Sequence, residues 1–531
     1  MNRRTFAAIV FAATALAAAP LHADAPAAGQ WQFSVDDGAT WTDRPPTVPA
    51  GKKMTVLART AVDVPDPRAA ACWSLSHALS PRLEMTLRIN GKDVPVPVPG
   101  MYYRTIPAVP AAMLQAGPNA LAATIVVDRR PPSWDRTMEM EDFTIPLPTE
   151  PAALTPGKLA IQTGPILGAF GADYFTVACR TTVPAAVTLT ATELNLVSNR
   201  RPAEPQQREL TSQPGLYHRF RVPRDPMATR IAYRLRAAAG KEDVRSETYQ
   251  VDLPVFGIKG RPGGRLRIVI AGDSRSNADD WALVAAAILK EKPDLLVFLG
   301  DMCDRGTSDW LWDEHYLASD AARRLLATVP YYPVHGNHEE YAPVMRKLFH
   351  TPSADGASLD WAQEIGPALI VGVDGRPAHD WRDTRWLQKT LETSKAKFLF
   401  FCTHYPAYSS GSNGRLDPKM GEPKDRGYTT ARRVFLPLLR KVGATAFLAS
   451  HEHMYERSEL PGGITQIIAA GAGAPRSRKH PDAAAANPYS KVLEPTLHYT
   501  LFDMQGDRCV YTAKRPDGTV IESLVFPARK P

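Results

Sequence analysis

Polar side chains follow five apolar runs in the second half of this 531-residue chain. The runs end in "AGDSR", "LGDMCD", "HGNHEE", "CTHYP" and "SHEH", which supply Asp273, Asp301, Asn337 with His338, His404, and His451 with His453. Carboxylates, amides and imidazoles together suit hard or borderline cations such as Fe, Zn or Mn. Ten of the 13 histidines lie between residues 315 and 498. The pattern therefore predicts a metal site in this part of the chain.

The elements that must position these side chains follow an α/β pattern. Apolar runs such as "LRIVIAG", "DLLVFLG" and "KFLFFCT" alternate with stretches of helical character around 279–291, 310–328, 382–394 and 428–442. Such alternation is typical of a mainly parallel sheet covered by helices. Because the carboxyl ends of parallel strands open on a shared crevice, we expect the five polar ends to converge there.

Two of the candidate ligands are separated by a single glutamate, His451 before it and His453 after it. If the strand continued in regular form, residues two apart would share a face, so both rings would look into one crevice and could reach two cations. Asp301, with two carboxylate oxygens, could bridge them. Two cations about 3.5–4 Å apart generate hydroxide at neutral pH and stabilise both oxygens of an in-line displacement at phosphorus. A lone "GD" or "GNH" is usually a turn, so the prediction rests on the ordered set.

With the motifs "GD", "GDMCD", "GNHEE", "THYP" and "SHEHMYER", residues 265–531 resemble the calcineurin-like metallophosphoesterase superfamily, and within it the purple acid phosphatase branch. The resemblance implies one metal bound by Asp273, Asp301 and His453, and a second bound by Asp301, Asn337, His404 and His451. It implies that His338 faces the phosphate and either stabilises its charge or protonates the leaving oxygen. The implied reaction is attack of a metal-bound hydroxide on phosphorus, without a covalent enzyme intermediate.

The sequence departs from the family at two positions. Arg275 stands where most of the superfamily has a histidine, and Asp304 stands where the purple branch has a tyrosine. The first metal site therefore lacks its usual extra ligand. Asp304 could supply a carboxylate, or Arg275 could clamp phosphate with two hydrogen bonds as a catalytic residue. The two could instead pair with each other, or Arg275 could supply positive charge in a site that holds one ion.

The residues before 265 have the pattern of strands. In 29–148, apolar and polar residues alternate on both sides of Asn90-Gly91, a dipeptide suited to a tight hairpin turn. This region loosely resembles a jelly-roll, sugar-binding-like β-sandwich, and 157–255 resembles a fibronectin III or immunoglobulin-like sandwich. We thus expect two all-β sandwiches followed by an α/β domain of the αββα type at 265–531. A carbohydrate ligand at the first sandwich is possible on fold alone, which does not imply function.

The chain begins "MNRRTFAAIVFAATALAAAPLHADA", which predicts a signal peptide over residues 1–25 and a periplasmic or secreted protein without a membrane span once it is removed. Arg3 and Arg4 resemble a twin-arginine signal. Five scattered cysteines indicate neither a disulfide framework nor a thiolate metal site. The formal net charge of +8, with no basic run, mildly favours anionic substrates and does not indicate a specific nucleic-acid binder.

Together these features favour an exported metal-dependent phosphoesterase with two metal ions, acting on a small phosphorylated substrate. Phosphomonoesters are the first choice and phosphodiesters the second. The alternative from another class is a carbohydrate or cell-surface binding protein whose catalytic domain has degraded. A serine hydrolase is disfavoured because no Gly-x-Ser-x-Gly elbow frames a serine in "AGDSR" or "SSGSNG".

Overall fold

The computed structural model describes residues 26, 28–70, 72–76, 84–94, 106–130, 141–145, 151–196, 206–253, 265–308, 311–353, 358–375, 384–419 and 421–529. The predicted signal peptide lies outside these residues. The chain forms two compact units, Met1–Val96 with Tyr102–Gly157, and Pro97–Met101 with Lys158–Pro531. Within the described ranges, no helix has the length and apolar character that a membrane crossing requires.

The first unit consists mainly of strands. One sheet has the order β1 (Gln32–Ser34), β3 (Lys53–Val64), β8 (Gly117–Asp128), β5 (Glu84–Ile89) and β6 (Lys92–Asp93). The other strands are β10 (Ala153–Pro156), β4 (Cys72–Ser76) and β7 (Ile106–Pro110) in a second sheet, and the pair β2 (Thr47–Val48) and β9 (Phe143–Thr144). Short 3-10 helices are η1 (Pro67–Ala69) and η2 (Ala111–Met113). Asn90 and Gly91 join β5 to β6 with φ values of 49° and 77°, the positive values that a tight hairpin turn needs.

The second unit begins with another strand-rich region. Its strands are β11 (Ile161–Phe170), β12 (Tyr174–Leu196), β13 (Gln207–Thr211), β14 (Gly215–Pro223), β15 (Ala228–Ala239), β16 (Glu242–Arg245) and β17 (Tyr249–Asp252). Strand β12 is a single strand of 23 residues. It pairs with β14 from Tyr174 to Arg180 and again at Ala185, and with β15 from Ala186. The register with β14 shifts between Arg180 and Ala185, a stretch that includes Pro184, which has no N–H to offer a partner strand. The prediction of a largely β N-terminal region is confirmed, and the particular sandwich topologies stay predictions.

The remainder of the second unit is built on two sheets. The first has the order β20 (Tyr331–Pro333), β19 (Leu295–Phe298), β18 (Arg265–Ala271), β28 (Tyr499–Gln505), β29 (Arg508–Lys514) and β30 (Val520–Pro527). The second has the order β21 (Trp361–Ile365), β22 (Ala368–Val373), β23 (Phe398–Thr403), β24 (Ala446–Ala449), β26 (Ile464–Ala469), β25 (Tyr455–Leu460) and β27 (Ser490–Glu494). Strands β18 to β20 are parallel to one another, and so are β22, β23, β24 and β26.

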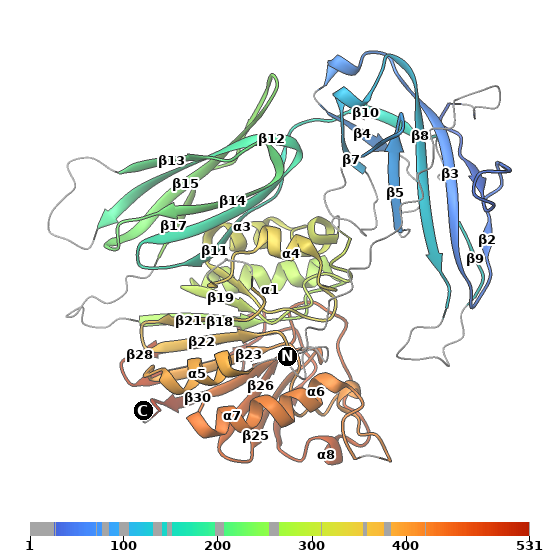
Figure 1. Cartoon of the computed structure of the whole chain (residues 1–531). Helices are drawn as coiled ribbons and strands as arrows, with labels where there is room; N and C mark the ends of the chain where they lie inside the picture. Colours follow the sequence, from blue (N-terminus) through green and yellow to red (C-terminus); the bar gives the residue numbers. More distant parts are fainter. Residues whose placement is uncertain are drawn as a thin grey trace, which may run out of the picture. The chain divides into compact units, whose positions relative to one another are not determined.

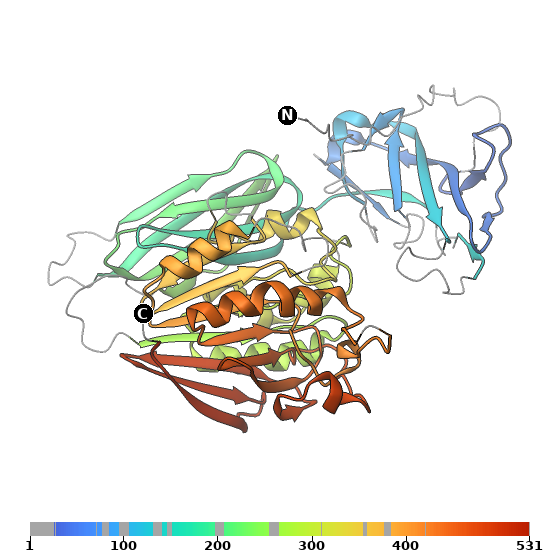
Figure 2. The same cartoon turned by 60° about the horizontal axis from the view of Figure 1, so that its bottom comes forward.

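Helices cover the outer faces of these two sheets (Figures 1 and 2). They are α1 (Ala278–Glu291), α3 (Asp320–Thr328), α4 (Pro343–Leu348), α5 (Arg385–Thr393), α6 (Arg426–Thr430), α7 (Leu436–Val442) and α8 (Ala483–Ala486), with the shorter turns η3 (Trp312–Tyr316), η5 (Ser412–Gly414) and η6 (Ala431–Phe435). The sheets contact each other through Phe400 and Phe502, whose ring centroids are 4.8 Å apart. Leu391 and Leu439 pack α5 and α7 against the second sheet. The predicted α/β domain is therefore confirmed as helices outside two facing sheets.

A polar contact joins strands β11 and β12 to this α/β part. Asp313, in η3, accepts hydrogen bonds from the Thr163 hydroxyl at 2.6 Å and the Gln162 amide at 2.9 Å, and it pairs with the buried guanidinium of Arg180. The buried Tyr233 hydroxyl in β15 also donates to the Ala327 carbonyl at the end of α3, at 2.7 Å. These bonds tie the second strand-rich region to the face of the α/β part that α3 covers.

Candidate metal centre

The candidate ligands lie together at the carboxyl ends of the parallel strands. Asp273 follows β18, Asp301 follows β19, and Asn337 and His338 follow β20 in the first sheet. His404 follows β23, and His451 and His453 follow β24 in the second sheet. The two facing sheets thus each contribute half of the site, as expected for a crevice at strand ends.

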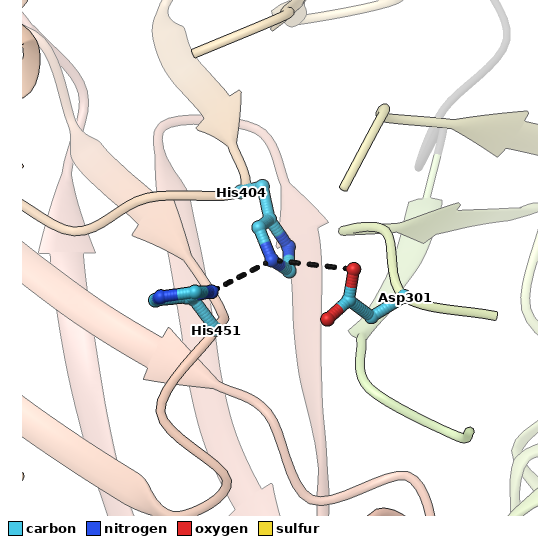
Figure 3. A group of neighbouring side chains, drawn as sticks. All are labelled: Asp301, His404 and His451. Carbon is cyan, nitrogen blue, oxygen red and sulfur yellow. Dashed lines mark hydrogen bonds and ion pairs between the residues drawn. The ribbon is translucent and has the colours of Figure 1, made fainter. Parts of the chain in front are cut away.

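One group of ligand atoms forms around His404 (Figure 3). Ligand atoms of Asp301, His404 and His451 all lie within 4.8 Å of one another. His404 Nε2 is 3.4 Å from Asp301 Oδ1 and 3.1 Å from His451 Nδ1. Asn337 Oδ1 lies 3.0 Å from each of the two imidazole nitrogens. Four side chains from four different strand ends thus surround one point.

The hydrogen bonds around this group leave its inward atoms without hydrogens. His404 Nδ1 donates to the Leu299 carbonyl at 2.8 Å, so in the neutral ring Nε2 carries the lone pair. His451 Nε2 lies 3.2 Å from Asp425 Oδ2, which leaves the lone pair of Nδ1 facing the group. Acceptors that face only acceptors need a cation among them. The donor set therefore fits a metal ion.

The electrostatics of His404 show the same need for positive charge. Burial alone lowers the pKa of this ring, but the neighbouring Asp301 carboxylate outweighs it and raises the pKa to about 9. Burial would raise the pKa of Asp301, yet the charge of His404 and the contact with it hold that pKa far below its usual range. A carboxylate held ionised beside imidazoles is ready to bind a metal.

A second group consists of Asp273, Asp301 and His453. His453 Nε2 is 3.4 Å from Asp273 Oδ1, and His453 Nδ1 donates to the Pro475 carbonyl at 2.6 Å. The other oxygen of Asp273 accepts from Ser450 Oγ and the His451 N–H, whereas Oδ1 is buried without a hydrogen bond in the described part of the chain. The carboxylate of Asp301 belongs to both groups, so its placement suits the predicted bridge between two ions.

Residues 266–455 match the family model described as calcineurin-like phosphoesterase. The chain carries a calcineurin-like phosphoesterase domain. The predicted family resemblance is confirmed over these residues, and a domain of this family supports a hydrolase.

One curated relative matches a shorter stretch of the chain. A probable glycerophosphodiester phosphodiesterase GpdQ from Arcobacter nitrofigilis is 28% identical over 138 residues, which are 23% of this chain and 45% of that protein. The chain thus matches less than half of the length of this relative.

Two solved structures share the fold. Purple acid phosphatase PPD1 from yellow lupin (Lupinus luteus) seeds has a TM-score of 0.57 at 14% identity, covering 91% of this chain and 95% of that chain. The structure of PhoD has a TM-score of 0.52 at 10% identity, covering 69% and 90% respectively. At these identities the likeness concerns the fold alone.

Three of the candidate ligands have left-handed backbones: Asp273 with φ 59°, Asp301 with φ 56° and His451 with φ 72°. A non-glycine residue rarely adopts this conformation, and strained residues concentrate at functional sites. Sequence analysis considered a strand that continues through His451 and His453. Strand β24 instead ends at Ala449, so both residues reach the site from a turn. The turn at His451 instead directs Nδ1 of one ring to the first group and Nε2 of the other to the second.

The turns that carry Asp301 and Asn337 are tightly packed. A Cβ at Gly336 would lie 2.3 Å from Asp301 Oδ1, so only glycine fits there. The buried Glu339 accepts N–H bonds from Asp301 at 3.0 Å, Met302 at 2.8 Å and Gly336 at 2.7 Å. Burial and the charge of Asp301 raise the pKa of Glu339 to about 7.

The two residues that depart from the family pattern contact each other. Arg275 Nη1 is 3.3 Å from Asp304 Oδ1, and Ser276 Oγ also donates to that oxygen. Asp304 belongs to neither group of ligand atoms, so the structure places it beside the site, engaged with other side chains. Arg275 Nε lies 3.7 Å from Asp301 Oδ2 and is buried without a hydrogen bond among the described residues. Arg275 therefore reaches the site and Asp304 orients it.

His338 lies on the same side of the site as Arg275. Its Nδ1 donates to the Asp304 carbonyl at 2.6 Å, and its Nε2 is 3.9 Å from Asp301 Oδ2. The side chain is 28% exposed, whereas those of Asp301 and His404 are buried. His338 is thus the most accessible of these three side chains, and Nε2 is its ring atom nearest to Asp301.

Sequence analysis missed two further partners of the ligands, Asp425 and Ser450. Asp425 caps α6 by accepting the Gly427 N–H at 2.8 Å, and its other oxygen faces His451. Ser450 precedes the "HEH" motif and holds Asp273, so its position next to the ligands was a usable signal. Asp425 sits in a helix cap 26 residues before its partner, which no local pattern indicates.

The serine-rich loop after His404 is built into the interior. Ser409, Ser410 and Gly411 are buried, and Glu456 accepts from the N–H of Ser410 at 2.9 Å. Glu452, between the two site histidines, accepts from the Asn413 N–H at 2.5 Å. The buried carboxylates of Glu452 and Glu456 therefore hold this loop in place, and the loop supports the turn that carries His451.

Proposed function

We propose that the protein is an exported metal-dependent phosphoesterase that hydrolyses phosphomonoesters. The observation that carries this proposal is the pair of ligand groups that share Asp301, with Arg275 and His338 beside the shared carboxylate. Such a site has the parts needed to hold a phosphate and to supply a proton to the leaving oxygen.

We propose two ions, with Asp273, Asp301 and His453 holding one, and Asp301, Asn337, His404 and His451 holding the other. The mixed nitrogen and oxygen donors suit Fe, Zn or Mn. Bound ions would act as Lewis acids, lowering the pKa of water and neutralising charge on the phosphoryl group.

His338 and Arg275 are proposed to act on the substrate directly. With Nδ1 committed to the Asp304 carbonyl, a protonated His338 has only Nε2–H left to donate. The unsatisfied Nε–H of Arg275 would bind an equatorial phosphate oxygen, and Asp304 would hold the guanidinium for that contact. Phosphate thus gains two donors on the side opposite the ligand histidines.

The test of the metal centre is the metal content of the purified exported protein, measured by elemental mass spectrometry for wild type and Asp301→Ala. The expected result is about two ions per chain, lost in the variant. Asp320→Ala is the matched control, because its carboxylate is 98% exposed and outside the site. About one ion per chain would indicate that the charge of Arg275 takes the place of the second ion. Absence of metal from wild type would contradict the proposal.

Phosphodiesters are the second candidate, favoured by the name of the GpdQ relative, a probable phosphodiesterase. Bis(4-nitrophenyl) phosphate and 4-nitrophenyl phosphate separate the two, because their leaving group is the same. A higher kcat/KM for the monoester is expected. A preference for the diester of about tenfold or more would assign the site to diesters.

Export and the N-terminal region are proposed from sequence alone. Residues 1–25 would be removed in a periplasmic or secreted protein, which N-terminal sequencing of the mature protein tests. Retention of Met1 in the exported fraction would contradict it. Residues 29–148 and 157–255 are proposed to form the jelly-roll-like and fibronectin-like sandwiches, the first with a possible carbohydrate ligand.

A further inference from the structure

Three cationic side chains lie close together just after the second group of ligands. Arg476, Arg478 and Lys479 are all exposed, and within the described chain none of them has an ion-pair partner. By contrast, the exposed Arg433 of this unit is paired with Glu422. Sequence analysis saw no basic run here because Ser477 interrupts it.

Backbone bonds fix this segment to the candidate metal centre. The Pro475 carbonyl accepts from His453 Nδ1, and the Ser477 N–H donates to the His453 carbonyl at 3.0 Å. The Ser477 hydroxyl in turn accepts the His453 N–H at 3.0 Å. Farther along, the His480 N–H donates to the Ser410 carbonyl at 2.9 Å. The cations therefore sit on a rigid segment held by the turns that follow β23 and β24.

The positive surface continues along α1. Arg476 lines an open groove with a volume of about 590 Å³, together with Lys290 and Arg515. Arg515 pairs with Glu494, and Asp517 is the sole carboxylate among the residues that line the groove. Apolar side chains, including the 57% exposed Leu283, form the rest of its wall. Arg476 thus joins this groove to the segment whose Pro475 carbonyl accepts from His453.

We propose that the basic rim of Arg476, Arg478 and Lys479 binds a second anionic group of the substrate. Preferred substrates would then be phosphoesters that carry a further phosphate or carboxylate. Exposed cations placed beside a site act mainly on substrate capture and on salt dependence. The inference rests on the proposed phosphoesterase function and names the substrate class of that site.

Fructose 1,6-bisphosphate and fructose 6-phosphate provide the test, with the double variant Arg478→Glu/Lys479→Glu. In wild type, kcat/KM is expected to be about tenfold higher for the bisphosphate, and the double variant should remove most of this preference through KM. Its kcat/KM for the monophosphate should change by less than about threefold. Added salt should weaken the preference of wild type and have little effect in the variant.

Lys395→Glu is the matched control, because this exposed lysine lies before β23, at the opposite edge of the sheet from the site. It should leave the preference unchanged. Equal kcat/KM for the two sugars in wild type, or an unchanged preference in the double variant, would overturn the inference while leaving the phosphoesterase intact. Failure to hydrolyse either sugar phosphate or 4-nitrophenyl phosphate with metal bound would instead overturn the proposed function. Binding to phosphatidylglycerol vesicles that the double variant loses, with KM unchanged, would assign the rim to a membrane surface and contradict the inference.

Discussion

Buried histidines occur in two settings in the second unit, and their environments have opposite effects on their charge. His218 bonds to the Ser212 hydroxyl at 2.7 Å, and burial lowers its pKa to about 4. The pKa of His350, which lies beside Arg219, is lowered to about 3, chiefly by burial. His404 is at least as buried, yet the Asp301 carboxylate raises its pKa to about 9. Burial alone keeps a core histidine neutral. A neighbouring carboxylate instead favours positive charge at the ring, as a metal site requires.

The largest test of this contrast is removal of the shared carboxylate. Asp301→Asn keeps the shape of the side chain but loses the charge that both ligand groups share. Metal content should fall to near zero, and kcat/KM should fall by at least about 1,000-fold. Elemental mass spectrometry and a 4-nitrophenyl phosphate assay measure the two effects. Retained metal with full activity would show that Asp301 is only structural.

A smaller effect is expected from the outer partner of His451. Asp425→Asn preserves an acceptor for the α6 cap but removes the charge that fixes the ring with Nδ1 facing the site. Metal affinity should fall by about 10- to 100-fold, the range for a carboxylate behind a ligand histidine. Isothermal titration with Zn²⁺ into chelator-treated protein measures it, and Asp417→Asn, in an exposed loop, is the control. Unchanged affinity would show that Asp425 merely caps the helix.

The same substitution, histidine to glutamine, can be compared in the two settings. His404→Gln should abolish metal binding at the first group. His218→Gln should leave metal content unchanged and lower the free energy of unfolding by about 1–3 kcal/mol, because it disturbs a buried hydrogen-bonded group. Metal analysis and urea denaturation of the chelator-treated variants separate these outcomes. Metal loss in His218→Gln would break the distinction between the two settings.

The smallest expected effect is on the pH dependence of stability without metal. The pKa of His218 is about 4 when folded and about 6.5 when unfolded. The unfolded chain therefore binds the proton first as pH falls, and stability decreases from about pH 6.5 toward 4. His404 has the opposite sign, since its stabilisation is complete below about pH 6.5 and is lost as pH rises through about 9.

Melting temperatures of chelator-treated protein from pH 4 to 9 measure both effects. His218→Gln should flatten the acid side of the curve, and His404→Gln should flatten the alkaline side. If the two variants changed the same side, the assigned directions of the pKa shifts would be wrong.

The sequence alone was sufficient to bring the candidate ligands together, because each follows an apolar run and the carboxyl ends of parallel strands open on a shared crevice. It also located the hairpin at Asn90-Gly91, whose conformation depends on two adjacent residues. Contacts between distant segments could not be predicted from the sequence. Asp425 meets His451, and Asp304 turns to Arg275 instead of a metal, only because tertiary packing brings these loops together.

The bonds from β11, β12 and β15 to Asp313 and Ala327 bear on how the protein can be divided for laboratory work. A recombinant fragment that starts at residue 265 would leave Asp313 without its guanidinium partner and uncover the surface that Tyr233 and Arg180 now bury. It should express poorly and aggregate. A fragment that starts at Lys158 keeps these contacts, so it is the better starting point for crystallisation and for metal-loading experiments.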